Sequence, residues 1–210
     1  MISGPLSAEL GLDAANLGLL TAVYFLVLAG AQIPIGVLLD RFGPRRVQSV
    51  LLVVAAGGAA LFAASTGLLE LLIARAMIGI GVAAALMAGL KAIVTWFPRE
   101  RVALINGYMI MLGALGAVTA TAPAEWLMGY SGWRGLFELS AAATLAAALL
   151  IFLAVPDKAQ LVLPQRTSLK LGAIYRDPRF WRIAPLSASC IGSAWSLQGL
   201  WAAPWLADVE

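Results

Sequence analysis

The sequence predicts an all-α protein that crosses a membrane several times. Of its 210 residues, 61% are hydrophobic and only 12% are charged, and the mean hydropathy is +0.90. A soluble domain carries about 25% charged residues, so this chain has too few to cover its surface in water. Its apolar stretches run for about 20 residues, the length that a helix needs to cross a bilayer, without the alternation of a barrel strand.

Six stretches have the length and hydropathy of membrane-spanning helices. They are 17–39, 47–66, 69–95, 103–122, 135–155 and 181–206. Charged residues, proline and glycine gather in the breaks between them. The longest break predicts three parts: an N-terminal bundle of five spans (1–155), a central loop (156–180) and the first helix of a second bundle (181–210).

Basic residues are distributed unequally between the two ends of these spans. The breaks after the first, third and fifth spans, with their flanks, hold 12 of the 14 lysine and arginine residues. They are Arg41, Arg45, Arg46, Lys91, Arg99, Arg101, Lys158, Arg166, Lys170, Arg176, Arg179 and Arg182. Because lysine and arginine favour the cytoplasmic side, loops 40–46, 96–102 and 156–180 are expected in the cytoplasm.

This orientation places the N-terminal end outside, where a translocation signal is needed. Residues 1–5 carry neither a basic group nor an apolar core, and residues 7–16 are typical of an external loop that follows a helix. We therefore expect one span before the given sequence and more after it. A six-span protein is the alternative interpretation.

Several function classes lack their usual residues. There is no histidine, and the one cysteine, Cys190, lies in an apolar stretch, so no disulfide framework, metal site or cofactor is expected. The spans contain no paired carboxylates and no Gly-x-Ser-x-Gly motif, which argues against an intramembrane enzyme. The net charge of +3 follows from the topology, and no nucleic-acid partner is predicted.

The break after the first span carries a recognisable motif. It reads Gly36-Val-Leu-Leu-Asp-Arg-Phe-Gly-Pro-Arg-Arg46. It resembles the signature G-x-L-a-D-R-x-G-R-K of the major facilitator superfamily, with Pro44 where a basic residue is usual. The matching residues are Gly36, Leu38, Asp40, Arg41, Gly43 and Arg45.

Elementary geometry suggests how this motif works. Gly36 would admit a neighbouring helix, Asp40 on the same face would lie against the positive end of another helix, and Gly43 would permit the turn. The resemblance implies a latch between the two halves of a transporter. An ordinary basic inner loop is the alternative.

A second motif lies in the third span. Arg75-Ala-Met-Ile-Gly79-Ile-Gly81 resembles the family signature R-x-x-Q-G-x-G, with Ile78 in place of the glutamine. Arginine within a span costs about 2.5–3.5 kcal/mol and usually has a partner or a wet cavity. Arg75 and Gly79 are therefore candidates for the cavity or the proton pathway, although Arg75 could instead reach the outer boundary.

Other polar residues within the spans are weaker candidates for the same cavity. These are Gln32, Tyr24, Asn106 and Gln198. Hydrogen bonding between helices is the more ordinary role for each. Lys91 is expected to extend to the cytoplasmic boundary rather than to bind a substrate.

The resemblance covers nearly the whole chain and corresponds to helices two to seven of a twelve-helix transporter, a partial bundle without helix one. It implies a secondary active transporter of a small molecule or ion that works by alternating access, with proton coupling as a family expectation. Resemblance in the stretch 200–206 suggests a small anion as the solute. The implied partners are the lipid bilayer and the missing helices. The alternative function is a non-transporting membrane module, or a fragment that needs a partner half.

Overall fold

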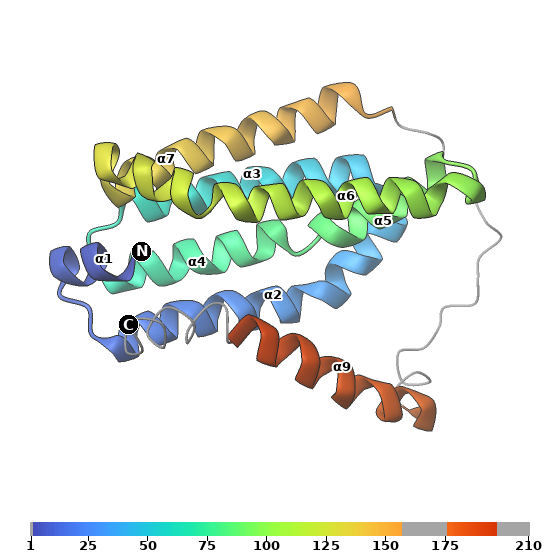
Figure 1. Cartoon of the computed structure of the whole chain (residues 1–210), viewed down its shortest axis with the longest axis horizontal. Helices are drawn as coiled ribbons and strands as arrows, with labels where there is room; N and C mark the ends of the chain where they lie inside the picture. Colours follow the sequence, from blue (N-terminus) through green and yellow to red (C-terminus); the bar gives the residue numbers. More distant parts are fainter. Residues whose placement is uncertain (1, 157–175, 197–210) are drawn as a thin grey trace. The chain divides into compact units, whose positions relative to one another are not determined.

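The computed structural model describes residues 2–156 and 176–196, and in this part of the chain every regular element is an α-helix. They are α1 (Ser3–Leu10), α2 (Ala14–Phe42), α3 (Pro44–Ala64), α4 (Leu68–Val82), α5 (Ala85–Trp96), α6 (Arg99–Thr119), α7 (Ala122–Ala154) and α9 (Pro178–Ser196). The chain divides into two units, residues 1–159 and 160–210. The first unit holds α1 to α7 (Figure 1).

Five stretches of helix in the described residues are long and apolar enough to cross a membrane: α2, α3, α4 together with α5, α6 and α7. Large apolar side chains face outward from them. On α6, for example, Ile110 is 68% exposed and Leu112 is 63% exposed. Such a surface is unfavourable in water and favourable in lipid, so the all-α polytopic membrane fold predicted from the sequence is confirmed.

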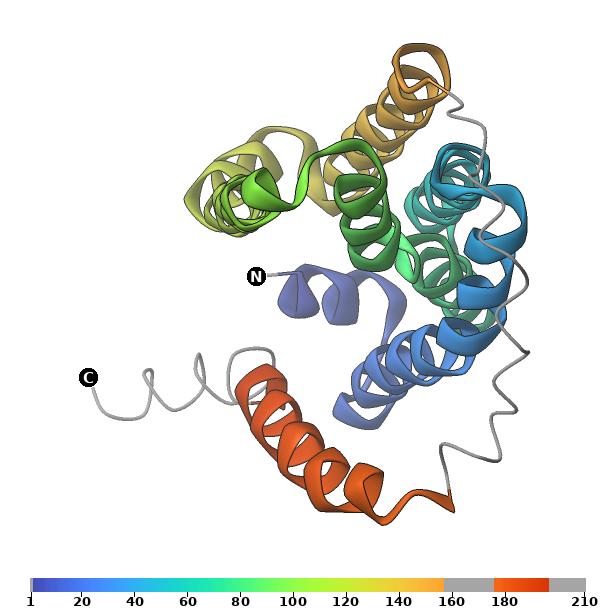
Figure 2. The same ribbon diagram turned by 90° about the vertical axis from the view of Figure 1, so that its right-hand side faces the viewer.

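Helix α3 is the most buried of the spans in the described part of the chain. It packs against α7 and against α4, and α4 packs in turn against α2, as the end-on view of Figure 2 illustrates. Small residues make the α3–α4 contact close. A Cβ atom on Gly58 would lie 2.8 Å from Cβ of Met77, so only glycine fits there.

Two clusters of buried apolar residues lie at opposite ends of the bundle. The first joins α1, α2, α3, α4 and α7 through Leu6, Leu12, Leu20, Phe62, Leu71, Ala74 and Trp133. The second joins α2, α3 and α5 through Ile35, Leu39, Val47, Leu51, Ala83, Ala84 and Ala88. Each cluster lies beneath one of the polar groups described below.

The predicted span 69–95 is interrupted in the structure. Helix α4 ends at Val82 and α5 begins at Ala85. The N–H of Ala83 bonds to the carbonyl of Ile80, three residues back, which tightens the last turn and ends the regular helix. Ala83 and Ala84 are only 4% and 0% exposed, and a break at membrane depth is tolerated where protein covers it.

Two stretches outside the predicted spans are helical. Residues 7–16 include the second half of α1, and α7 begins at Ala122, before the predicted start at 135. Gly132 forms a kink inside α7, where it has φ 66° and ψ −177°, so α7 consists of two helices joined at this residue. Glycine accepts this positive φ without strain, so the chain turns and continues as helix.

The second unit contributes one described helix, α9, with Pro185 inside it. The predicted span 181–206 is described only as far as Ser196. Gln198 and residues 157–175 of the predicted central loop 156–180 lie outside the described residues. The three-part division of the chain therefore stays a prediction.

Candidate functional site

The arginine of α4 lies among aromatic rings. Its guanidinium carbon is 4.9 Å from the ring centre of Phe62 on α3 and 6.0 Å from that of Phe137 on α7. Phe62 and Phe137 are themselves stacked, with ring centres 4.1 Å apart. The Nε atom of Arg75 is buried and has no hydrogen-bond partner in the described residues. Cation–π contact thus stabilises part of the charge but leaves a donor unused.

Close packing of α2 on α4 brings two further candidates to this arginine. A Cβ on Gly79 would lie 2.8 Å from the carbonyl oxygen of Tyr24, so glycine at 79 is what lets the two helices touch. Tyr24 is half-buried on α2, and its backbone carbonyl lies against Gly79, one helical turn from Arg75. Arg75, Gly79 and Tyr24 form what we call the arginine site.

The structure does not gather the other candidates there. Gln32 lies eight residues beyond Tyr24 on α2, about 12 Å along the helix axis. Asn106 is on α6, which packs beside α5 and α7, and its buried Oδ1 atom has no hydrogen-bond partner in the described part of the chain. Gln198 lies outside the described residues.

The motif 36–46 forms a very short connection. Helix α2 extends to Phe42 and α3 begins at Pro44, so Gly43 alone separates them, and the loop predicted at 40–46 is mostly helical. Gly43 has φ 81°, and its N–H bonds to the carbonyl of Leu39. The positive φ accounts for glycine at this position, as the motif predicted.

The acidic residue of the motif has a charged partner among the described residues. Asp40 accepts a bond of 2.7 Å from the ammonium of Lys91 on α5, and its predicted contact with the end of another helix stays a prediction. Lys91 also donates to the carbonyl of Leu39 at 2.7 Å. The lysine therefore joins α5 to the C-terminal end of α2, where the helix dipole favours a cation.

Of the remaining residues of the motif, Arg45 contacts another helix, whereas Arg41 and Gly36 lie at more open positions. Arg45 donates from Nε and Nη2 to the carbonyl of Phe152, at 2.8 and 2.5 Å, and lies 4.9 Å over its ring, which ties α3 to α7. Arg41 is exposed and lies over the ring of Phe42. A Cβ on Gly36 would meet no atom within 4 Å, so the close helix approach expected there is absent from the described structure.

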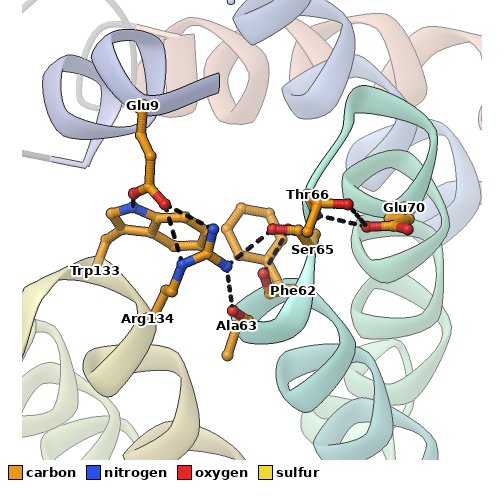
Figure 3. A network of polar contacts seen from close by, with 8 residues as sticks. All are labelled: Glu9, Phe62, Ala63, Ser65, Thr66, Glu70, Trp133 and Arg134. Carbon is orange, nitrogen blue, oxygen red and sulfur yellow. Dashed lines mark hydrogen bonds and ion pairs between the residues drawn. The ribbon is translucent and has the colours of Figure 1, made fainter. Parts of the chain in front are cut away.

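Sequence reasoning missed a polar group at the other end of the bundle (Figure 3), which we call the outer cluster. Its members are Glu9 of α1, Ala63 and Ser65 at the end of α3, and Trp133 and Arg134 of α7. Glu9 accepts from the indole N–H of Trp133 at 2.6 Å and from Nη2 of Arg134 at 2.7 Å. Arg134 donates from Nη1 to the carbonyls of Ala63 and Ser65.

Through these hydrogen bonds and the Glu9–Arg134 ion pair, the outer cluster joins α1, the end of α3 and α7. The hydrogen bonds from Arg134 and then Trp133 lower the pKa of Glu9 below its usual range, because they stabilise the carboxylate. Trp133 is only 3% exposed. The signal in the sequence was a lone arginine beside acidic residues at the predicted outer face, but nothing local pointed to Glu9.

The whole chain was compared with known proteins. The model of the Major Facilitator Superfamily matches residues 1–209. The chain belongs to the Major Facilitator Superfamily. This confirms the resemblance that the motifs at 36–46 and 75–81 suggested, and with the apolar helices it makes the chain a multi-pass membrane protein.

Curated members of the Major Facilitator Superfamily resemble parts of this chain. A nitrate/nitrite transporter of Picosynechococcus is 34% identical over 102 residues, which are 49% of this chain and 19% of that protein. The hexuronate transporter of Escherichia coli is 28% identical over 93% of this chain and 50% of its own length. A 4-hydroxybenzoate transporter of Acinetobacter baylyi is 30% identical over 74% of this chain and 34% of its own length. The chain thus spans half the length of these relatives at most.

No group of three or more metal-binding side chains occurs among the described residues. The arginine site holds a cation among aromatic rings. At the two ends of the bundle, ion pairs join helices. Neither arrangement provides a nucleophile next to a base.

Proposed function

We propose that this chain is part of a secondary active transporter in a bacterial inner membrane, and that the transporter moves a small anion by alternating access. The observation that supports this is the arginine site. Placing a guanidinium in a membrane span is costly, and Arg75 keeps a buried N–H donor without a partner in the described residues. A planar oxyanion would supply the missing acceptor and would match the fork of the guanidinium.

The relatives support the same class of solute. Nitrate, nitrite, hexuronate and 4-hydroxybenzoate, which name the transporters compared above, are all oxyanions of small size. Tyr24 lies one helix away, with its carbonyl against Gly79, and the rings of Phe62 and Phe137 contact the guanidinium of Arg75. Carriers bind and release their solutes unchanged, and we propose no catalytic role for any residue.

The contacts at the basic end support a role in conformational change. Asp40 with Lys91 and Arg45 with Phe152 join α2 to α5 and α3 to α7 at one end of the bundle. We assign Gly36, Asp40, Arg41, Gly43 and Arg45 to a latch on this end. Alternating access needs the latch to hold in one state and to loosen in another.

The test is uptake of radiolabelled solutes by cells that express the complete gene containing this chain. The panel holds nitrate, a hexuronate and 4-hydroxybenzoate, with a neutral hexose and a monovalent cation as comparisons. Arg75→Gln should reduce anion uptake at least about tenfold, the effect of losing one charge-assisted hydrogen bond. Arg101→Gln, at an exposed arginine in the first turn of α6, serves as the matched control.

Two results would contradict the proposal. One is full anion uptake by the Arg75→Gln variant at normal expression. The other is uptake of the neutral hexose or the cation with no response to any anion. A protonophore arm separates proton-coupled from uncoupled movement of whichever solute is accepted.

The exposed surface of α6 indicates that other helices pack on it in the complete protein. None of its residues is buried, although its span is as apolar as the others. We propose that additional helices of the same transporter cover part of this surface. Cross-linking from Leu112→Cys in the complete protein tests this, and only lipid contact at that position would contradict it.

A further inference from the structure

A groove lies at the basic end of the bundle, apart from the arginine site. It has a volume of about 190 Å³ and is bounded by three helices. One face of α5, from Ala85 to Trp96, forms one wall. The first turns of α3, with Arg45 and Gln48, and the end of α7 form the others. Most of these side chains are apolar, so water has few partners in the groove.

The groove has the length of a lipid chain. Its lining on α5 extends from Ala85 to Trp96, which is about 16 Å of helix. One leaflet of a bilayer contributes about 15 Å of hydrocarbon. The small side chains at 88, 89 and 92 create the depression along this face, and the break between α4 and α5 marks its inner end.

The two charged or amide side chains of the lining lie in the first turns of α3, at the basic end. Arg45 lies there, held by its bonds to the carbonyl of Phe152. Gln48 lies three residues further along α3, about 4.5 Å deeper. It is 8% exposed, and its Oε1 atom has no hydrogen-bond partner in the described residues. A buried carboxamide without a partner is rare and calls for a ligand or water.

This order of groups matches a phospholipid from its charged head to its tail. The guanidinium of Arg45 would face the phosphate, and the carboxamide of Gln48 lies at the depth of the glycerol and ester groups. An amide can present its oxygen or, after half a turn, its N–H groups, so either a hydroxyl or an ester carbonyl finds a partner. The apolar length beyond it would take an acyl chain.

We propose that this groove binds one anionic phospholipid, with an acyl chain along α5 between α3 and α7. The positive charge of the basic end favours a lipid with an anionic head group. The ends of α2, α3, α5 and α6 that meet there carry Arg41, Arg45, Arg46, Lys91, Arg99 and Arg101, with Asp40 and Glu100 as the acidic residues. Each basic residue near a surface adds attraction for anionic lipid. The proposal does not depend on the transport function.

The test is native mass spectrometry of the full 210-residue chain in detergent, with added phosphatidylglycerol or phosphatidylcholine. We expect one phosphatidylglycerol per chain, retained about tenfold better than phosphatidylcholine. Ala92→Leu fills the groove and should lower this retention about tenfold, the equivalent of about two methylene groups withdrawn from it. Ala103→Leu, the same change at an exposed position on α6, should leave it unchanged.

Two more variants test the polar contacts if Ala92→Leu does not fold. Arg45→Gln should bring retention of phosphatidylglycerol down to that of phosphatidylcholine. Gln48→Leu should weaken both lipids while preserving the helical circular dichroism spectrum. Equal retention of the two lipids by the wild type, or unchanged retention in Arg45→Gln and Gln48→Leu, would overturn the proposal. So would displacement of the lipid by inorganic phosphate, since the site would then recognise the anion alone.

Discussion

The ammonium of Lys91 lies 2.7 Å from the carboxylate of Asp40, although the two residues are 51 positions apart in the chain. The same nitrogen holds the carbonyl of Leu39. One lysine thus binds both the charge and the backbone at the end of α2. The pair lies at an exposed edge, since the Asp40 side chain is 82% exposed, and this decides how its loss should appear.

Asp40→Asn should impair transport without unfolding the protein. An exposed ion pair contributes about 0–1 kcal/mol to stability, so the melting temperature should change little. Uptake should fall because the latch is lost, and the exchanged pair Asp40→Lys with Lys91→Asp should restore part of it. Wild-type uptake by Asp40→Asn, measured together with thermal unfolding, would show that the pair has no part in transport.

The close contact of α3 and α4 predicts opposite effects of one substitution at two glycines. A Cβ on Gly81 would lie 2.6 Å from the carbonyl of Leu51, so Gly81→Ala should lower the free energy of unfolding by about 1–3 kcal/mol. Gly113 on α6 has open space around it, so Gly113→Ala should raise that free energy by up to about 1 kcal/mol. Thermal unfolding of both variants in one detergent checks this. Equal melting temperatures would mean that α3 and α4 do not approach so closely.

The outer cluster should make stability depend on pH. The folded pKa of Glu9 lies below its unfolded value, so its contribution is complete above the ordinary glutamate pKa of about 4.3 and is lost as the pH falls through the folded value. The melting temperature should therefore decrease more steeply on acidification in the wild type than in Glu9→Gln. Glu138→Gln, an exposed glutamate further along α7, is the control. If the melting temperatures of all three proteins changed with pH in parallel, the hydrogen bonds of Glu9 would contribute nothing to stability.

The predicted orientation can be tested by labelling cysteines. In a Cys190→Ser background, Glu100→Cys in the first turn of α6 and Glu125→Cys in the first turn of α7 lie at opposite ends of α6. An impermeant thiol reagent added to intact cells should label position 125 and spare position 100 until the cells are opened. Labelling of both positions from outside would contradict the topology predicted from the basic residues.

The amino-acid sequence was enough to predict that this chain lies in lipid, that it is helical, and to which family it belongs. Hydropathy and charge are properties of each segment alone, so a stretch such as 47–66 indicates a helix in lipid without knowledge of its neighbours. The motif at 36–46 likewise marked the turn at Gly43, because a tight turn needs a positive φ at that residue.

Contacts between residues far apart in the chain became visible only in the packed helices. Glu9 and Arg134 are 125 positions apart, and Arg75 lies over rings from two other helices. No local pattern contains such pairs, because they depend on how closely whole helices pack and on which faces they turn to one another. For the same reason the break after Val82 and the open space at Gly36 could be found only in the packed bundle.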